Sequence, residues 1–353
     1  MVFCSLVEFF LLYYKIYLWG DKMIPKFMNK NSNIYLVAPS FGCTTSPYKE
    51  RLEESLKNFK KLGYNVILGD NVYKNDGIAG SNTPKLRALE INEAWKSDCD
   101  AIMSVGGGET MIETLEHIDF DYIKNNPKWF SGYSDNTNLT YTITTMCDME
   151  TIYGVHAASF YNYPFKYDSK DLWNMLHGEK EFSGYKSFQF NKKDDNPLAK
   201  YNFDRRTKII ANNYTNPIEG RIIGGCLDCL STICGTKFDN TKEYIENHKD
   251  EGVIFFFEAC ELNSISVRRI LTQLKYAGWF SNVKMFVVGR SLNYYDKSFG
   301  VSINDSYLDI LKDFNVPIIL DAPIGHLGPT LPIRCGGLAT VEVVNNNIKI
   351  SYK

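Results

Sequence analysis

The sequence predicts an α/β fold with two domains. An N-terminal domain has a flavodoxin-like parallel sheet, and a second α/β domain ends in a small β element. Two observations support this prediction. Short apolar runs alternate along the 353 residues with segments of helical periodicity, which is typical of a parallel sheet with helices on both faces. This alternation stops between about residues 161 and 217 and then starts again, which indicates two domains.

The first half of the chain contains the first series of strands and helices. The predicted strands cover residues 33–38, 64–68, 101–105 and 129–133. Residues 48–62 place their apolar side chains on one helical face, and Gly63 ends this helix. A second helix begins at Pro84 and runs to Trp95, because proline is well suited to the first turn of a helix.

The second half contains a similar series. Residues 253–257 (VIFFF) are intensely apolar and predict a central strand. Residues 266–277 predict a helix that Gly278 ends. The remaining predicted strands, the last two of them a hairpin, cover residues 284–288, 316–320, 338–344 and 348–352. We therefore expect an N-terminal domain, a connecting segment and a C-terminal domain at residues 23–160, 161–217 and 218–353.

Residues 1–22 form an apolar N-terminal extension whose role the sequence leaves open. Two charges, Glu8 and Lys15, interrupt it, whereas a membrane-spanning helix needs about 20 apolar residues with few charges. It also lacks the basic start and the small-residue end of a signal peptide. We favour a third interpretation, in which translation begins at Met23 or Met28. We expect no stable membrane association.

The composition narrows the class of function. Hydrophobic residues make up 44%, which is enough for a sizeable core, and the net charge of −2 does not predict a nucleic-acid partner. Nine scattered cysteines favour a reducing compartment, so we expect a cytoplasmic protein. Cys226 and Cys229 have the spacing of half a zinc site, but no second pair follows at matching spacing. We interpret them as buried residues on a helix.

Three polar residues stand where predicted strands end. Ser134 follows WFSGY, Glu258 follows VIFFF, and His326 lies in the loop after VPIIL. Sites in open parallel sheets form at the carboxyl ends of the strands. A serine nucleophile needs a base within hydrogen-bond reach, and the base needs an acceptor that orients it. The three residue types could supply these three roles.

The same residues also have simpler interpretations. Ser134 could be a turn residue or a helix N-cap, Glu258 could pair with an arginine, and His326 could be an ordinary loop histidine. Asn136 also stands where the nucleophile motif G-x-S-x-G has its second glycine. On these residues alone, a hydrolase is one interpretation among several.

Four segments resemble the LD-carboxypeptidase family of serine peptidases, which includes the microcin C self-immunity peptidases. In chain order they match its first strand, nucleophile signature, F-L-E segment and histidine loop, at residues 34–40, 130–137, 256–261 and 325–332. The resemblance extends from about Met23 to the C-terminus. It implies that Ser134, His326 and Glu258 form a Ser-His-Glu triad that needs no metal and no cofactor.

The resemblance also implies an oxyanion hole, in which backbone N–H groups stabilise a tetrahedral intermediate. Our candidates are the N–H groups of Asp135 and Gly107, since a glycine lets the backbone approach a substrate closely. Further candidates for substrate contact are Gly106, Gly108, Glu261 and Trp173. Trp173 could stack on a base, although a tryptophan buried in the core is more common. The glycine turn lacks the spacing of a phosphate-binding motif.

The expected reaction is hydrolysis of an amide bond near a free carboxylate through an acyl-enzyme. The resemblance offers two small substrates: an L,D-muropeptide in peptidoglycan recycling, or an aminoacyl-nucleotide of the microcin C type in self-immunity. It also implies a homodimer. The alternative is a catalytically inactive binding protein on the same scaffold. A glutamine amidotransferase-like enzyme would need a cysteine at the strand end, but Cys147 lies in the following predicted helix. A phosphate-binding metabolic enzyme is a further alternative.

Overall fold

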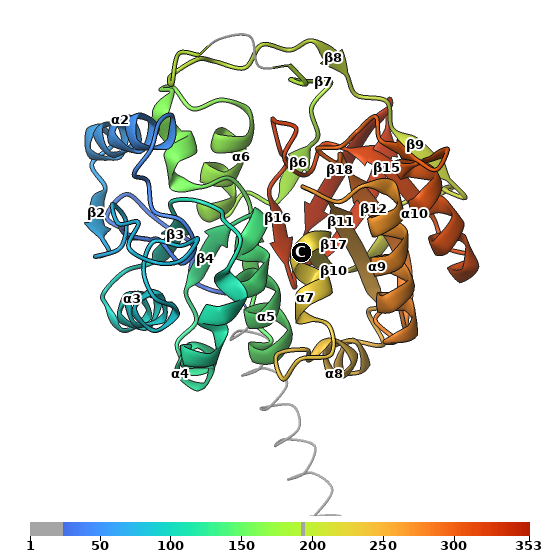
Figure 1. Cartoon of the computed structure of the whole chain (residues 1–353), viewed down its shortest axis with the longest axis horizontal. Helices are drawn as coiled ribbons and strands as arrows, with labels where there is room; N and C mark the ends of the chain where they lie inside the picture. Colours follow the sequence, from blue (N-terminus) through green and yellow to red (C-terminus); the bar gives the residue numbers. More distant parts are fainter. Residues whose placement is uncertain (1–23, 192–194) are drawn as a thin grey trace, which may run out of the picture.

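The computed structural model describes residues 24–191 and 195–353, and the predicted extension at 1–22 lies outside them. Within the described residues, the chain forms a six-stranded sheet and an eight-stranded sheet, together with two short two-stranded ribbons. The two large sheets lie beside each other, the first toward the left of Figure 1 and the second toward the right. The predicted α/β fold class is confirmed.

The first sheet is built mainly from the N-terminal half. In sheet order its strands are β16 (Ile333–Cys335), β5 (Thr151–Tyr153), β4 (Trp129–Gly132), β3 (Ala101–Ser104), β1 (Asn33–Val37) and β2 (Asn65–Leu68). All neighbours are parallel except β16, which is antiparallel to β5. The four strands predicted in this half are confirmed. Strands β5 and β16 were not predicted, and β16 comes from near the C-terminus.

The second sheet has a parallel centre and antiparallel edges. In order its strands are β6 (Glu181–Ser183), β18 (Asn347–Tyr352), β17 (Leu338–Val344), β10 (Ile218–Cys226), β11 (Val253–Glu258), β12 (Val283–Gly289), β15 (Ile318–Ala322) and β9 (Ile210–Asn212). Strands β10, β11, β12 and β15 are mutually parallel. The predicted strands and the hairpin are confirmed. Strands β6 and β9 belong to the predicted connecting segment, whose limits stay a prediction.

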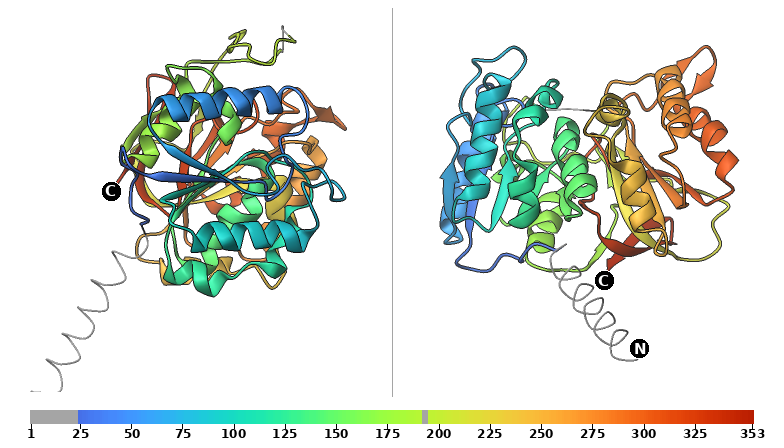
Figure 2. Two further views of the ribbon diagram at one scale, coloured as in Figure 1. Left: turned by 90° about the vertical axis from the view of Figure 1, so that its left-hand side faces the viewer. Right: turned by 90° about the horizontal axis from the view of Figure 1, so that it is seen from below.

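The ribbons and helices complete the fold. The ribbons pair β7 (Ser187–Phe188) with β8 (Arg205–Arg206) and β13 (Lys297–Ser298) with β14 (Val301–Ser302). The α-helices are α2 (Tyr48–Lys61), α3 (Pro84–Lys96), α4 (Phe120–Asn125), α5 (Thr137–Cys147), α6 (Tyr167–Leu176), α7 (Leu227–Ile233), α8 (Thr241–Asn247), α9 (Ser264–Tyr276) and α10 (Ile303–Leu311). The 3-10 helices are η1 (Met111–His117), η2 (Ser134–Asn136), η3 (Ala157–Tyr161) and η4 (Lys312–Phe314). Helices α2 and α3 cover opposite faces of the first sheet (Figure 2, left).

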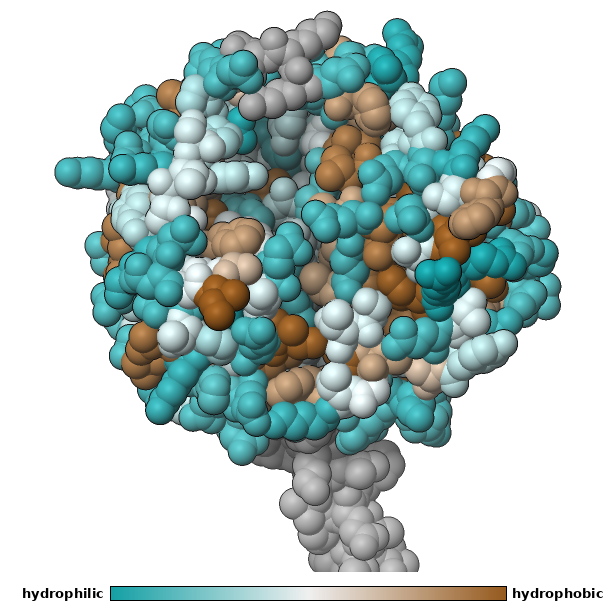
Figure 3. Space-filling view, viewed as in Figure 1, coloured by the Kyte–Doolittle hydropathy of each residue, from teal (hydrophilic) through white to brown (hydrophobic). Residues whose placement is uncertain are grey.

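The described residues form three apolar clusters. One lies between the first sheet and helices α3 and α5. Another lies between the second sheet and helices α7 to α10. The third contains residues of both sheets. The surface seen in Figure 3 is mainly hydrophilic, and its apolar residues lie in small groups. In the part of the chain that the structure describes, no helix is long and apolar enough to cross a membrane.

Helix α5 joins the two sheets directly. The backbone N–H of Cys226, at the end of β10, donates a 3.0 Å hydrogen bond to Oγ1 of Thr137 at the start of α5. Cys226 is in turn in register with Glu258 at the end of β11. Farther along α5, the ring of Tyr141 stacks on Trp279 with centroids 5.2 Å apart. These contacts bring the strand end that precedes α5 close to the end of β11.

Candidate active site

Ser134 lies at a sharp turn between β4 and α5. Its φ angle is +61°, a left-handed backbone conformation that non-glycine residues rarely adopt. The Asn136 side chain donates a 2.9 Å hydrogen bond to the carbonyl of Gly106 and so fixes this turn to the glycine turn after β3. A Cβ at Gly132 would approach the Asn136 side chain to 2.8 Å. The strand, strained turn and helix have the arrangement of a nucleophile elbow, although the second glycine of that motif is Asn136.

The structure brings together the three residues that the sequence singled out. The hydroxyl of Ser134 lies 2.9 Å from Nε2 of His326, and Nδ1 of His326 lies 2.8 Å from Oε2 of Glu258. Glu258 is fully buried. Gly325 precedes the histidine with a φ of +113°, and a Cβ there would lie 2.8 Å from Oε2 of Glu258. Glycine is therefore required beside His326, both by the backbone conformation and by the available space.

The charges of Glu258 and His326 depend on each other. Burial opposes the charged imidazole, but the Glu258 carboxylate and a contact with Cys260 hold the pKa of His326 well above its usual value. Burial likewise opposes the charged carboxylate, but His326, Tyr153 and Cys226 keep the pKa of Glu258 below its usual value. The carboxylate is thus ionised, and His326 is a strong proton acceptor.

Tyr153, the last residue of β5, lies beside Ser134 and Glu258. Its hydroxyl accepts a 3.2 Å hydrogen bond from the backbone N–H of Ser134 and donates one to Oε1 of Glu258. Burial, together with the charge of Glu258, raises the pKa of Tyr153 well above its usual value, so the hydroxyl stays protonated. Tyr153 was not among the residues predicted from the sequence, because β5 was not predicted. The signal available was a tyrosine at the end of the short apolar run TIY.

The glycine turn after β3 lies against Ser134. A Cβ at Gly107 would come within 3.2 Å of Cβ and 3.3 Å of Oγ of Ser134. The buried side chain of Asp135 holds this turn: its Oδ2 accepts hydrogen bonds from Oγ of Ser40 at 2.5 Å and from the N–H of Met111 at 3.0 Å. A Cβ at Gly108 would lie only 2.1 Å from the same Ser40 hydroxyl. Small residues at this turn therefore keep the backbone close to the nucleophile.

Two other candidates for substrate contact have different surroundings. Glu261 has an exposed side chain, and its backbone N–H donates to Oδ1 of Asp228 at 3.0 Å. Trp173 is on α6, and its ring packs against Phe59 of α2 and against Tyr64, with centroid distances of 5.9 Å and 4.7 Å. It is not among the described residues that line the cavity beside the triad. Trp173 thus packs as a core tryptophan, and we leave it out of the proposed site.

A cavity of about 660 Å³ opens beside His326. One wall contains Tyr133 and His156, which follow β4 and β5, and burial lowers the pKa of His156 to about 3, so it is neutral. Much of the remaining lining comes from the predicted connecting segment. The basic and aromatic residues that line the cavity include Tyr48 and Arg51 of α2, together with Tyr161, Tyr163, Lys166, Tyr167, Phe190, Lys200 and Tyr201. The connecting segment is therefore part of the candidate site.

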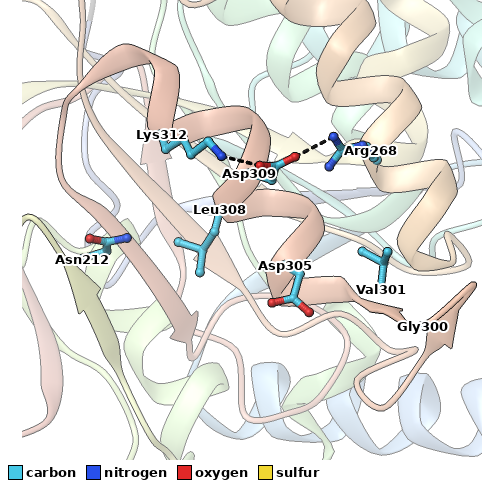
Figure 4. Close-up of a pocket in the computed structure, with 8 residues that line it drawn as sticks. All are labelled: Asn212, Arg268, Gly300, Val301, Asp305, Leu308, Asp309 and Lys312. Carbon is cyan, nitrogen blue, oxygen red and sulfur yellow. Dashed lines mark hydrogen bonds and ion pairs between the residues drawn. The ribbon is translucent and has the colours of Figure 1, made fainter.

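A second hollow lies far from these residues, beside α9 and α10 (Figure 4). Asp309 of α10 pairs with Arg268 at 2.5 Å and also with Lys312. Because these charges neutralise one another and the hollow is not lined by any of the three predicted catalytic residues, we place the candidate site at Ser134.

The C-x-x-C pair, Cys226 and Cys229, lies close to the backbone of Ser134. Cys229 is on α7 as predicted, whereas the helix prediction is wrong for Cys226, which ends β10. Both are buried. The thiol of Cys229 lies 3.6 Å from the carbonyl of Ser134, and the thiol of Cys226 lies 3.3 Å from Oδ2 of Asp228. Among residues 24–191 and 195–353, no cluster of three or more His, Cys, Asp or Glu side chains is arranged to hold a metal ion.

Comparison with known families gives the class of this protein. The LD-carboxypeptidase N-terminal domain matches residues 34–154, and the LD-carboxypeptidase C-terminal domain matches residues 219–341. The two matches cover more than half of the chain. The chain therefore belongs to the LD-carboxypeptidase family of serine peptidases, as its motifs predicted.

Individual relatives cover nearly the whole chain. The microcin C7 self-immunity protein MccF of Escherichia coli is 26% identical over 313 residues, which are 86% of this chain and 88% of that protein. A probable murein peptide carboxypeptidase of Bacillus subtilis is 24% identical over 333 residues, 92% of this chain and 93% of that protein. A solved structure of MccF in complex with aspartyl sulfamoyl adenosine has a TM-score of 0.78 at 24% identity, covering 93% and 98% of the two chains. This structural likeness establishes the fold.

Proposed function

We propose that the protein is a serine carboxypeptidase or amidase that cleaves an amide bond near a free carboxylate through an acyl-enzyme. The observation that carries this proposal is the hydrogen-bond chain from Ser134 through His326 to Glu258 beside the cavity. Family membership supports it, since the relatives include a protein named as a murein peptide carboxypeptidase. An inactive scaffold would have no need of this chain of hydrogen bonds.

Each member of the triad has a defined role in this proposal. The Ser134 hydroxyl attacks the carbonyl carbon while Nε2 of His326 takes its proton. The same imidazole then returns the proton to the leaving amine, which departs and leaves the acyl group on Ser134. Glu258 holds the imidazole through Nδ1 and stabilises its positive charge. Water, activated by the same base, attacks the ester and releases the acid and the free serine.

The proposed oxyanion hole uses backbone N–H groups next to Ser134. The N–H of Ser134 itself is bound to the hydroxyl of Tyr153. The two remaining candidates are the N–H of Asp135, which follows the nucleophile, and the N–H of Gly107, whose Cα lies against Ser134. Donors fixed at these positions stabilise the developing negative charge without reorganising.

The cavity suits a small, negatively charged substrate. Arg51, Lys166 and Lys200 bring positive charge to its walls and outnumber the one carboxyl there, that of Asp168. Several tyrosines offer flat apolar faces. A muropeptide carries free carboxylates, and an aminoacyl-nucleotide carries an acidic group and a base. The solved MccF structure contains aspartyl sulfamoyl adenosine, so both substrate classes remain part of the proposal.

Two substrates test the proposal directly. The purified protein is incubated with a muropeptide tetrapeptide that ends in D-alanine, and separately with aspartyl sulfamoyl adenosine, and the products are followed by mass spectrometry. We expect cleavage of one of them, lost in Ser134→Ala and kept in Ser281→Ala, which changes an exposed serine. Cleavage that survives Ser134→Ala would show that the triad is wrong. A folded wild-type protein that cleaves neither substrate would favour the inactive scaffold.

We also propose a homodimer in a reducing, cytoplasmic compartment. The eight cysteines within the described residues are all free, which suits such a compartment. Sedimentation equilibrium tests the dimer, and a single species with the mass of one chain would contradict it.

A further inference from the structure

We infer that Tyr153 is a positioning residue whose hydroxyl ties the backbone of the nucleophile to the carboxylate of the triad. This inference rests on the proposed function, because it concerns the same site. Tyr153 does not contact the reacting atoms of Ser134 or His326. It acts through the backbone of Ser134 and through the carboxylate of Glu258.

The hydrogen bonds around Tyr153 form a closed ring. Its hydroxyl joins the N–H of Ser134 at 3.2 Å to Oε1 of Glu258. The second oxygen of Glu258 is 2.8 Å from Nδ1 of His326, and Nε2 of His326 is 2.9 Å from Oγ of Ser134. The ring thus begins and ends at the nucleophile, once at its backbone and once at its side chain.

The direction of both hydrogen bonds at the Tyr153 hydroxyl is fixed. A backbone N–H can only donate, so the oxygen of Tyr153 accepts from Ser134 and its proton remains for Glu258. The hydroxyl is protonated because burial and the adjacent carboxylate both disfavour its anion. The Tyr153 ring is 1% exposed and packs edge-on against Tyr133 and Phe256, with centroids 6.1 Å and 5.4 Å away. Packing therefore allows the hydroxyl little freedom.

This ring has two consequences for the site. Glu258 is fully buried, and an oxygen without a donor there would be costly, so Tyr153 satisfies the oxygen that His326 does not reach. Tyr153 is also on β5 of the first sheet, whereas Glu258 is on β11 of the second. One hydroxyl therefore aligns the sheet that carries the nucleophile with the sheet that carries the carboxylate, and it holds Ser134 in its strained conformation.

Tyr153→Phe tests the inference, because it removes the hydroxyl and keeps the aromatic side chain. We expect kcat to fall about 10- to 100-fold with KM nearly unchanged, since the substrate does not contact this hydroxyl. We also expect the acid limb of kcat/KM to move to higher pH. Without its donor from Tyr153, the Glu258 carboxylate interacts more strongly with the imidazolium of His326 and raises its pKa. The titratable groups facing His326 are Glu258, Cys260, Tyr133, Glu109 and His156, and all of them are kept in the variant.

The matched control is Tyr141→Phe. It also removes a buried tyrosine hydroxyl, which is 2.9 Å from Oγ1 of Thr241. The loss of stability should therefore be comparable to that of Tyr153→Phe, while the hydrogen-bond ring at the triad stays intact. We expect it to keep the wild-type kcat and pH profile. A Tyr153→Phe variant with wild-type kcat would overturn the inference. So would a lower kcat with an unmoved acid limb, because that is the result of a merely structural role.

A second readout separates this inference from the proposed function. The chain has five histidines, so NMR can follow the titration of His326 in both variants without any substrate. An upward shift of its pKa in Tyr153→Phe supports the inference even if the wild type cleaves neither test substrate, whereas no shift overturns it. If Tyr153→Phe does not fold, Tyr153→His replaces it, since an imidazole N–H can donate toward Glu258. Its acid limb should then lie near that of the wild type, and a large upward shift would contradict the inference.

Discussion

The hydroxyl of Ser134 lies 2.9 Å from Nε2 of His326, although the two residues are 192 positions apart in the sequence. The contact depends on both sheets, because Ser134 follows β4 of the first and His326 follows β15 of the second. It also depends on α5, whose first residue, Thr137, is hydrogen-bonded to the end of β10. The candidate triad therefore exists only when the two sheets are joined as observed, and the following predictions test it.

Replacing the triad carboxylate should slow the reaction without removing the nucleophile. In Glu258→Gln, the amide has one acceptor oxygen for two donors, Nδ1 of His326 and the hydroxyl of Tyr153. We expect kcat to fall about 10³- to 10⁴-fold, since the imidazole loses its orientation and the partner of its charge. Steady-state cleavage measures this loss. Glu53→Gln, at an exposed position of α2, is the control. A Glu258→Gln variant with more than a tenth of wild-type kcat would contradict the role of Glu258.

The pH dependence of the reaction should have a definite sign. His326 must be neutral to accept the proton of Ser134, and its pKa in the folded protein lies well above its usual value of 6.5. We therefore expect kcat/KM to decrease as the pH is lowered through a midpoint above 6.5. In Glu258→Gln the imidazolium loses its neighbouring charge, so the midpoint of the residual activity should move to lower pH. A midpoint that moves to higher pH would show that Glu258 does not set the pKa of His326.

A side chain at Gly107 should block the site and leave the fold intact. The new Cβ of Gly107→Ala would lie 3.3 Å from Oγ of Ser134, in the space where the substrate carbonyl approaches. We expect kcat/KM to fall at least about 10²-fold, comparable to the loss of one oxyanion donor. The free energy of urea unfolding should change by less than about 1 kcal/mol, because the substitution adds a single methyl at a partly exposed position. Near-normal activity would exclude Gly107 from the oxyanion hole.

The buried carboxyl of Glu90 should make stability depend on pH. It accepts hydrogen bonds of 2.7 Å from the N–H groups of Ala38 and Asn71, and burial raises its pKa from 4.5 to about 7. An acid with a raised pKa in the folded state contributes stability at low pH, which is lost as the pH rises through about 7. The stability advantage of the wild type over Glu90→Gln should therefore be about 1–3 kcal/mol larger at pH 5 than at pH 8.

Urea unfolding at the two pH values measures this difference. Glu93→Gln is the matched control, since Glu93 is on the same helix and exposed. Its effect should be small and equal at both pH values. An advantage for the wild type over Glu90→Gln that is larger at pH 8 would contradict the raised pKa.

The sequence determined the elements whose signals are local. Apolar runs that end at turn residues identified β1, β3, β4, β11 and β15. The last three of these runs placed Ser134, Glu258 and His326 after strand ends, where a site in a parallel sheet forms. Helix α3 was predicted from Pro84, which begins it. A chain segment of about ten residues contains all the information that such an element needs, because its periodicity records which side faces the core.

Only the tertiary structure decided which distant segments meet. Strand β16 joins the first sheet although it lies near the C-terminus, because the edge of β5 offers it backbone hydrogen-bond partners that no local pattern reveals. The surroundings of single side chains were also decided there. Trp173 packs among rings of α2 and its neighbours, whereas Tyr153 lies between Ser134 and Glu258. Residue type and spacing fix what a side chain can do, but its partners depend on how two sheets pack together.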